Sequence, residues 1–412
     1  MKPLLIAESD IAGGAARSTY RLHQSLRTIG VNSQVLVRSK LSVDAAVIKY
    51  ETPQTKLGPS LNGLPLNFYP KRDRSIMFSP QWFPDPIAPK VAQISPDVIS
   101  LHWVCNGYLQ IETLAKFNKP IVWTIHDMWA FTGGCHYNQE CDRYTDSCGA
   151  CPQLGSSNNQ DLSRLVWQRK AKAWKNLNLT IVSPSSWLAK CAQASSLFGQ
   201  LRVEVIPYGL DTSMYQPIDR QVARKILGLP TDKQLVLCAT SDHRKGFHLL
   251  CPAIQSLSKS GWQDKIELVI FGPSQPDSQT DVGVKLHYLG KFSDDISLQL
   301  IYAAADVFIA PSIQDNLPNT VMEAIACGTP CVAFNIGGMP DMIEHQQNGY
   351  LAEPYRVDDL AQGIAWVLEN PERHQKLCFR AREKTEKEFT LEDQGYRYLS
   401  LFNEILAGCE KT

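Results

Sequence analysis

The chain alternates short apolar runs with longer stretches in which apolar residues recur at helical spacing. The runs are rich in β-branched and aromatic residues, which is typical of parallel strands buried on both faces. They occupy residues 4–7, 35–37, 97–103, 121–127, 181–183, 203–207, 235–239, 268–271, 286–289, 306–310 and 331–334. This alternation predicts an α/β protein with doubly wound parallel sheets. Because 412 residues exceed one typical hydrophobic core, we expect two domains.

The stretch 311–334 carries the most informative chemistry. Pro318 stands where the first turn of a helix tolerates a missing N–H, and Gly328 fits the left-handed position that ends the helix. Asp315 and Glu323 lie around the start of this helix, after a strand, where open α/β sheets bind ligands. The helix N-terminus suits an anion such as a pyrophosphate, and carboxylates accept hydrogen bonds from sugar hydroxyls. The alternative is an ordinary crossover with solvated acids.

A second candidate loop follows the first predicted strand. Gly13 and Gly14 separate that strand from a helix whose apolar face ends before Gly30. Backbone N–H groups in such a loop can approach a phosphate closely. The loop lacks the GxGxxG fingerprint of dinucleotide sites, and a tight turn alone also explains two glycines.

Four of the 12 cysteines are concentrated within 17 residues, in the order C-x5-C-x6-C-x2-C. They are Cys135, Cys141, Cys148 and Cys151, in an insert that we place at 131–155. In a reducing compartment four thiolates favour a closed structural zinc site, to which we assign no catalytic role. Two disulfides or free thiols are the alternatives.

Composition and charge narrow the class of protein. The chain is 44% hydrophobic and 20% charged, which is ordinary for a globular protein, and its net charge is zero. It lacks an apolar run long enough to span a membrane, and its N-terminal apolar run is too short for a signal peptide. We therefore expect a cytoplasmic protein without a nucleic-acid partner.

The two halves differ in charge. Residues 1–214 hold 22 Lys and Arg against 15 Asp and Glu, whereas the rest of the chain is acidic. A helix predicted at 162–177 combines basic residues with Trp167 and Trp174, as helices on anionic membranes do. It indicates peripheral contact with the inner face of the cell membrane, with a solvated helix as the alternative.

The spacing around Asp315 resembles the signature of a known enzyme family. Asp315, seven residues and then EAIACGTPCVA from Glu323 onward follow the pattern of the retaining nucleotide-sugar glycosyltransferases of family four. Lys245 followed by glycine, His126 in Thr-Ile-His-Asp and the stretch 337–351 stand in the family's order as well.

The resemblance implies roles for these residues. Glu323 would hold the ribose, Asp315 would orient the donor sugar, and His126 would lie against the sugar at the reaction centre. Further substrate-binding residues would be Gly13 and Gly14 in the glycine loop and Asn316, Leu317 and Pro318 beside Asp315.

The resemblance also implies a diphosphate clamp made of two cations. Lys245 matches one of them, as a catalytic residue that stabilises the departing diphosphate. Thr240 stands where the family has an Arg, so Arg244 is expected to supply the second charge.

The family implies the GT-B architecture, in which two Rossmann-like domains face a cleft. We place the acceptor domain at 1–214 and the donor domain at 215–390, with a helix at 391–412 that crosses back to the first domain. The implied activity is transfer, with retention and without a catalytic metal, of a hexose-type sugar from a nucleoside diphosphate-sugar to a glycan or lipid-linked acceptor in polysaccharide biosynthesis. The alternatives are an epimerase or phosphorylase of the same fold, or a sugar-nucleotide sensor or scaffold without turnover.

Overall fold

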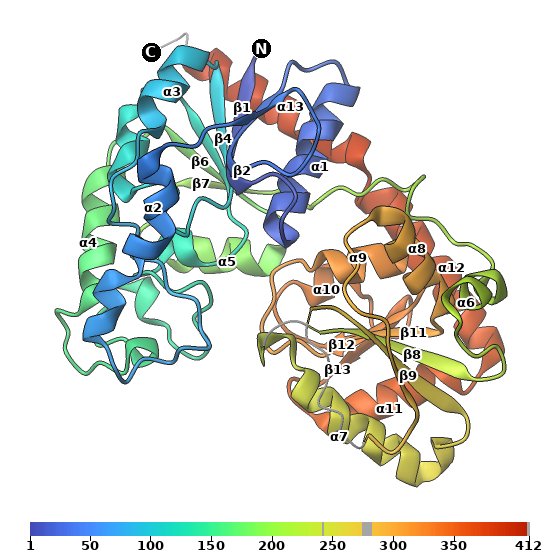
Figure 1. Ribbon diagram of the computed structural model, residues 1–412. Helices are drawn as coiled ribbons and strands as arrows, with labels where there is room; N and C mark the ends of the chain where they lie inside the picture. Colours follow the sequence, from blue (N-terminus) through green and yellow to red (C-terminus); the bar gives the residue numbers. More distant parts are fainter. Residues whose placement is uncertain (241–242, 274–281, 410–412) are drawn as a thin grey trace. The chain divides into compact units, whose positions relative to one another are not determined.

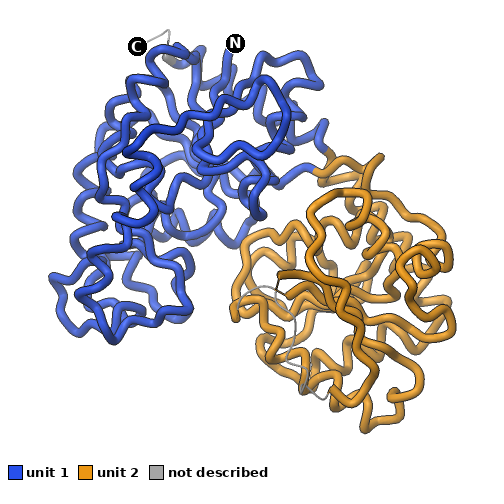
Figure 2. Tube along the Cα trace, in the orientation of Figure 1, with its two compact units in different colours: residues 1–209, 391–412 blue, residues 210–390 orange. Residues whose placement is uncertain are grey.

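A computed structural model describes residues 1–240, 243–273 and 282–409. The chain forms two compact units, one made of residues 1–209 and 391–412 and the other of residues 210–390 (Figure 2). Each unit contains one parallel sheet with helices on its faces (Figure 1). No helix in these described ranges combines the length and the apolar composition that crossing a bilayer requires.

The first unit is built on seven parallel strands in the order β3-β2-β1-β4-β5-β6-β7. They are β1 (Pro3–Ser9), β2 (Gln34–Ser39), β3 (Val47–Lys49), β4 (Val98–Leu101), β5 (Ile121–Thr124), β6 (Leu179–Ser183) and β7 (Arg202–Val205). The helices are α1 (Gly14–Thr28), α2 (Pro53–Asn62), α3 (Ile87–Ile94), α4 (Leu162–Trp174), α5 (Ser186–Ala194) and α13 (Leu391–Cys409).

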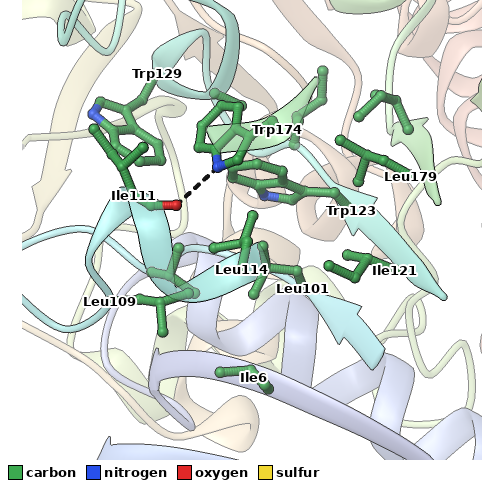
Figure 3. Close-up of a cluster of buried hydrophobic side chains, with 14 of the residues drawn as sticks. Ile6, Leu101, Leu109, Ile111, Leu114, Ile121, Trp123, Trp129, Trp174 and Leu179 are labelled. Atoms are coloured by element: carbon green, nitrogen blue, oxygen red, sulfur yellow. Dashed lines mark hydrogen bonds between the residues drawn. The ribbon is translucent and has the colours of Figure 1, made fainter. Parts of the chain in front are cut away.

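Alternate residues of these strands enter two different cores. Leu4 and Ile6 of β1 pack in a cluster with side chains of α3, α4 and α5, whereas Leu5 packs with side chains of α1 and α13. The sheet is therefore covered on both faces, which explains why its strands are apolar throughout. Figure 3 shows the first core, where the rings of Trp123 and Trp174 meet edge to face with centroids 5.1 Å apart.

The C-terminal helix α13 belongs to the first unit. Its residues Tyr398 and Phe402 are fully buried in the second of these cores, and the Tyr398 hydroxyl lies 2.7 Å from Oγ1 of Thr124 at the end of β5. Gly395 allows α13 to approach α1 closely, because a Cβ there would lie 2.3 Å from Oγ of Ser25. The return of the last helix to the first unit confirms that part of the expected fold.

The second unit has six parallel strands in the order β10-β9-β8-β11-β12-β13. They are β8 (Gln234–Ala239), β9 (Ile266–Phe271), β10 (Leu286–Tyr288), β11 (Val307–Ala310), β12 (Cys331–Phe334) and β13 (Gly349–Ala352). The helices are α6 (Arg220–Leu227), α7 (Phe247–Leu257), α8 (Asp295–Ala304), α9 (Asn319–Ala326), α10 (Met339–Met342), α11 (Val357–Leu368) and α12 (Pro371–Glu388).

Both units follow the doubly wound pattern predicted from the sequence. In each, the first strand lies inside the sheet, and later strands are added first on one side of it and then on the other. In the second unit this reversal falls between β8 and β11, which pair directly. The loops that follow the carboxyl ends of these two strands are where such sheets bind ligands.

Candidate functional site

The loops after β8 and β11 bring together two residues that are 70 positions apart in the sequence. Lys245 ends a short turn, His243–Lys245, between β8 and α7, and Asp315 lies between β11 and α9. The Lys245 Nζ is 2.6 Å from Oδ2 of Asp315. The pair therefore stands at the point where the strand order of this unit reverses.

Asp315 is a buried carboxylate with several partners. Nη1 of Arg244 is 3.3 Å from its Oδ1, the Ser312 hydroxyl lies 3.2 Å from its Oδ2, and the backbone N–H of Asn316 donates to Oδ1 at 3.1 Å. Burial by itself would raise the pKa of Asp315, but the charges of Lys245 and Arg244 lower it to about 2. The group is thus ionised, and two cations surround one negative charge.

Two glycines allow the backbones around this cluster to pack. Gly246 follows Lys245 with φ +74°, and a Cβ there would lie 1.7 Å from the carbonyl oxygen of Pro311. Gly337, after β12, has φ +53°, and a Cβ there would lie 2.0 Å from the carbonyl oxygen of Asp315. Only glycine fits either position without moving the loops.

Glu323 lies on α9 and is buried. The hydroxyl of Tyr302, on α8, donates a hydrogen bond of 2.9 Å to its Oε2. Asn316, Leu317 and Pro318 are buried in the segment before α9. The helix begins at Asn319, one residue later than the sequence predicts, because Pro318 keeps an extended conformation with ψ 124°.

Thr240 and Arg244 differ in where their side chains lie. Thr240 is buried, and its hydroxyl is 3.4 Å from the carbonyl oxygen of Phe271 at the end of β9. Arg244 contacts the Asp315 carboxylate and also donates a hydrogen bond of 2.8 Å to the carbonyl oxygen of Gln314. Arg244 and Lys245, although adjacent in sequence, therefore point to the same carboxylate.

His126 lies in the first unit, two residues after β5. Its Nδ1 is 2.7 Å from the hydroxyl of Tyr208, and its Nε2 is 3.2 Å from Nδ1 of His102. Burial lowers the pKa of His126 to about 4, so the ring is neutral near pH 7. Sequence reasoning assigned no role to Tyr208 or Tyr302, since nothing in the local pattern shows that these tyrosines contact His126 and Glu323.

The glycine loop of the first unit lies at the start of α1. Gly13 is the residue before the helix and has φ +91°, and Gly14 is its first residue. A Cβ at Gly13 would meet no atom within 4 Å, so the backbone angle and not crowding favours glycine there.

The four clustered cysteines line one cavity of about 20 Å³. All four are free thiols, and the backbone N–H of Gly133 lies 3.1 Å from Sγ of Cys148. Within residues 1–240, 243–273 and 282–409, no three Cys, His, Asp or Glu side chains are already arranged to hold a metal ion. The four cysteines thus lie close together, but their side chains are not arranged as the ligands of a zinc ion.

The helix expected to lie on a membrane, α4, has a different environment. Lys170 is buried, with its Nζ 3.7 Å from the ring centroid of Trp129, and Arg169 forms an ion pair with Glu112 at 2.7 Å. Trp174 lies in the core and donates to the carbonyl oxygen of Ile111 (Figure 3). Lys170 and Trp174 therefore serve tertiary packing and do not belong to an exposed basic face, whereas contact of this helix with a membrane stays a prediction.

Comparisons with known proteins agree with this architecture. The family described as "Glycosyltransferase Family 4" matches residues 12–214, and "Glycosyl transferases group 1" matches residues 219–384. Sulfoquinovosyl transferase SQD2 of Arabidopsis thaliana is 26% identical over 333 residues, which cover 78% of this chain and 59% of that protein. The chain spans about half the length of the curated relatives it matches.

Two solved structures share the fold over the whole chain. Sucrose-phosphate synthase from Thermosynechococcus elongatus has a TM-score of 0.72 at 19% identity, covering 99% of this chain and 100% of that one. Anabaena HepE, solved in complex with UDP and glucose, has a TM-score of 0.68 at 17% identity, covering 98% and 99%. These likenesses confirm the expected GT-B fold. Since the two family matches are adjacent and together span nearly the whole chain, the protein belongs to the group 1 glycosyltransferases of family four.

Proposed function

We propose that the protein transfers a hexose-type sugar, with retention, from a nucleoside diphosphate-sugar to a glycan or lipid-linked acceptor. The observation that carries this proposal is the cluster of Lys245, Arg244 and Asp315 at the carboxyl ends of β8 and β11. Two cations around one ionised carboxylate leave a net positive charge, which favours an anionic ligand. HepE, which shares the fold, was solved with UDP and glucose, so UDP-hexoses are the first donors to test.

We then assign a role to each residue of the cluster and to Glu323. Lys245 and Arg244 stabilise the charge on the departing diphosphate, a task that needs no catalytic metal. Asp315 accepts hydrogen bonds from sugar hydroxyls, and Glu323 accepts them from the ribose. Backbone N–H groups near Asn316 and Leu317, before α9, add contacts to the donor.

The acceptor side of the proposal rests on the family. We propose that the product is a polysaccharide or glycolipid assembled in the cytoplasm, with the protein in peripheral contact with the inner face of the membrane. His126 and the loop of Gly13 and Gly14 are the groups of the first unit that we assign to this reaction. The measurement is co-sedimentation with anionic vesicles, in which protein that stays in the supernatant would contradict the membrane contact.

Calorimetric titration with a panel of UDP-, GDP- and ADP-sugars tests the donor site. We expect one donor to bind at micromolar concentration and binding to be lost in Glu323→Ala and Lys245→Ala. Lys285→Ala is the matched control, because this lysine is in the same unit and its side chain is 68% exposed. Failure of every donor to bind the folded protein would contradict the proposal, and binding without transfer to any acceptor would indicate a sensor.

We propose separately that Cys135, Cys141, Cys148 and Cys151 hold a structural zinc ion. Their thiols line one cavity, and a backbone N–H close to Cys148 is a contact that also stabilises thiolates. Binding requires the side chains to turn toward a common centre, with Zn–S distances of about 2.3 Å.

Elemental analysis tests this site. We expect purified protein to carry about one zinc ion. The Cys148→Ser variant should lose this ion, whereas the Cys251→Ser variant, which is altered outside the cluster, should keep it. Metal-free folded protein with four reactive thiols in the cluster would contradict the proposal.

A further inference from the structure

His126 is the middle of a chain of hydrogen-bonding side chains in the first unit. The Tyr208 hydroxyl lies 2.7 Å from Nδ1 of His126, Nε2 of His126 lies 3.2 Å from Nδ1 of His102, and Nε2 of His102 lies 3.2 Å from the hydroxyl of Ser100. All four side chains are buried. The chain thus runs from the segment after β7 to the interior of β4.

The chain has an ordered direction because every member is neutral. Burial lowers the pKa of both histidines, so each ring carries one N–H. Either each group donates toward Ser100 or each donates toward Tyr208, and hydrogen bonds in such a series strengthen one another. In both directions the tautomer of His126 is coupled to the hydroxyl of Tyr208.

The charge of Asp127 raises the pKa of His126 and so opposes the effect of burial. The carboxylate of Asp127 nevertheless forms its hydrogen bonds with other side chains. Its Oδ2 lies 2.7 Å from Nδ1 of His136 and accepts a hydrogen bond of 3.0 Å from Nε1 of Trp103. Both ring nitrogens of His126 are engaged by Tyr208 and His102. A ring held in this way is suited to a fixed orientation and not to general-base catalysis.

The Tyr208 ring also packs on His126. The two rings stack with centroids 5.5 Å apart and an interplanar angle of 20°. Tyr208 therefore contacts the imidazole of His126 in two ways, through its hydroxyl and through its ring.

We propose that Tyr208 is the positioning residue of His126: its hydroxyl and ring fix the orientation and tautomer with which His126 takes part in sugar transfer. This inference rests on the proposed function for its effect on rate, whereas the state of the His126 ring can be measured without any substrate.

The test compares Tyr208→Phe, which keeps the ring and removes the hydroxyl, with Tyr108→Phe. Tyr108 is a matched control because its hydroxyl is also buried in the first unit but donates to the carbonyl oxygen of Leu36, at 3.3 Å. Nitrogen-15 NMR of the histidine rings gives the tautomer of His126, with its signal assigned from a His126→Gln sample. Steady-state kinetics with the donor and acceptor give kcat and KM.

In Tyr208→Phe we expect a mixture of His126 tautomers and a kcat about tenfold lower, with donor KM changed less than about twofold, because one buried hydrogen bond is lost. Tyr108→Phe should leave the His126 signal and kcat unchanged. An unchanged His126 signal in Tyr208→Phe, or an equal loss of kcat in both variants, would overturn the inference. If the wild-type protein transfers no sugar, the proposed function fails, and the NMR comparison alone decides the role of Tyr208.

Discussion

The ammonium group of Lys245 lies 2.6 Å from Oδ2 of Asp315, and this carboxylate holds the cations of the cluster in place. Arg244 reaches the other carboxylate oxygen, at 3.3 Å. A site whose charges are already in place needs less reorganisation when a diphosphate binds or departs. Under the proposed function, the carboxylate also competes with the phosphate oxygens of the donor for the same two cations, and this competition can be measured.

Asp315→Asn should separate binding from turnover. Removing the negative charge relieves the competition, so UDP should bind the variant at least as tightly as it binds the wild type. We expect a gain in affinity of about threefold to tenfold, because both cations are then available to the phosphate oxygens. Sugar transfer should fall at least tenfold, because the acceptor of hydrogen bonds from the sugar is weakened. Calorimetry with UDP and a transfer assay measure the two effects.

Asp358→Asn is the control for that experiment. Asp358 is also paired with an arginine, Arg356, at 2.6 Å, but its side chain is 67% exposed in a different part of the unit. It should change neither quantity. Weaker UDP binding by Asp315→Asn would mean that the carboxylate helps the cations more than it competes with them.

The depressed pKa of Asp315 predicts a loss of stability in acid. The folded-state pKa is about 2 against an ordinary value of 3.8, so the stabilisation is fully present above about pH 5 and is lost as the pH falls toward 2. The loss should be about 1 kcal/mol at pH 3 and about 2 kcal/mol at pH 2.

Urea unfolding of the wild type and Asp315→Asn at pH 6 and pH 3 measures this contribution. The wild type should lose about 1 kcal/mol more than the variant between the two pH values. Equal losses of unfolding free energy in the wild type and the variant would show that the cations do not stabilise the ionised form of Asp315.

Gly246→Ala should misplace Lys245. An alanine there needs φ +74° and puts its Cβ 1.7 Å from the carbonyl oxygen of Pro311, so the loops after β8 and β11 must separate. Gly261→Ala is a matched control, because φ is +87° but no atom lies within 4 Å of the added Cβ. The control should cost about 1–2 kcal/mol from backbone strain alone. Gly246→Ala should cost more and weaken donor binding, as thermal unfolding and calorimetry can show. Equal losses in the two variants would contradict the close contact.

The strands and the general location of the site could be predicted because they depend on local patterns. Apolar runs identify strands buried on both faces, and the rule for doubly wound sheets places the loop of Lys245 beside that of Asp315. No knowledge of side-chain packing is needed for either step.

The direction of side chains could not be predicted, because it depends on packing between distant segments. Arg244 is held near Asp315 by a contact between two loops, in which the backbone N–H of Ile313 donates to the carbonyl oxygen of Arg244. Lys170 was expected on a basic surface but lies in the core, over Trp129. The pairing of Tyr208 with His126 joins residues 82 positions apart, which no local motif records.

Tyr302→Phe should weaken donor binding through Glu323. The Tyr302 hydroxyl donates to Oε2 of Glu323 at 2.9 Å, and both side chains are buried, so its removal leaves the carboxylate without one of its donors. The carboxylate that we assign to the ribose then loses its fixed orientation, and donor affinity should fall about threefold to tenfold.

Tyr350→Phe is the control, since the Tyr350 hydroxyl donates to the carboxylate of Asp359 at 2.7 Å in the same unit. Both variants should lose about 1–2 kcal/mol of unfolding free energy, whereas only Tyr302→Phe should bind the donor less tightly. If calorimetry shows the same affinity for both, Glu323 does not need Tyr302 to hold the ribose, and its assignment would have to rest on the family alone.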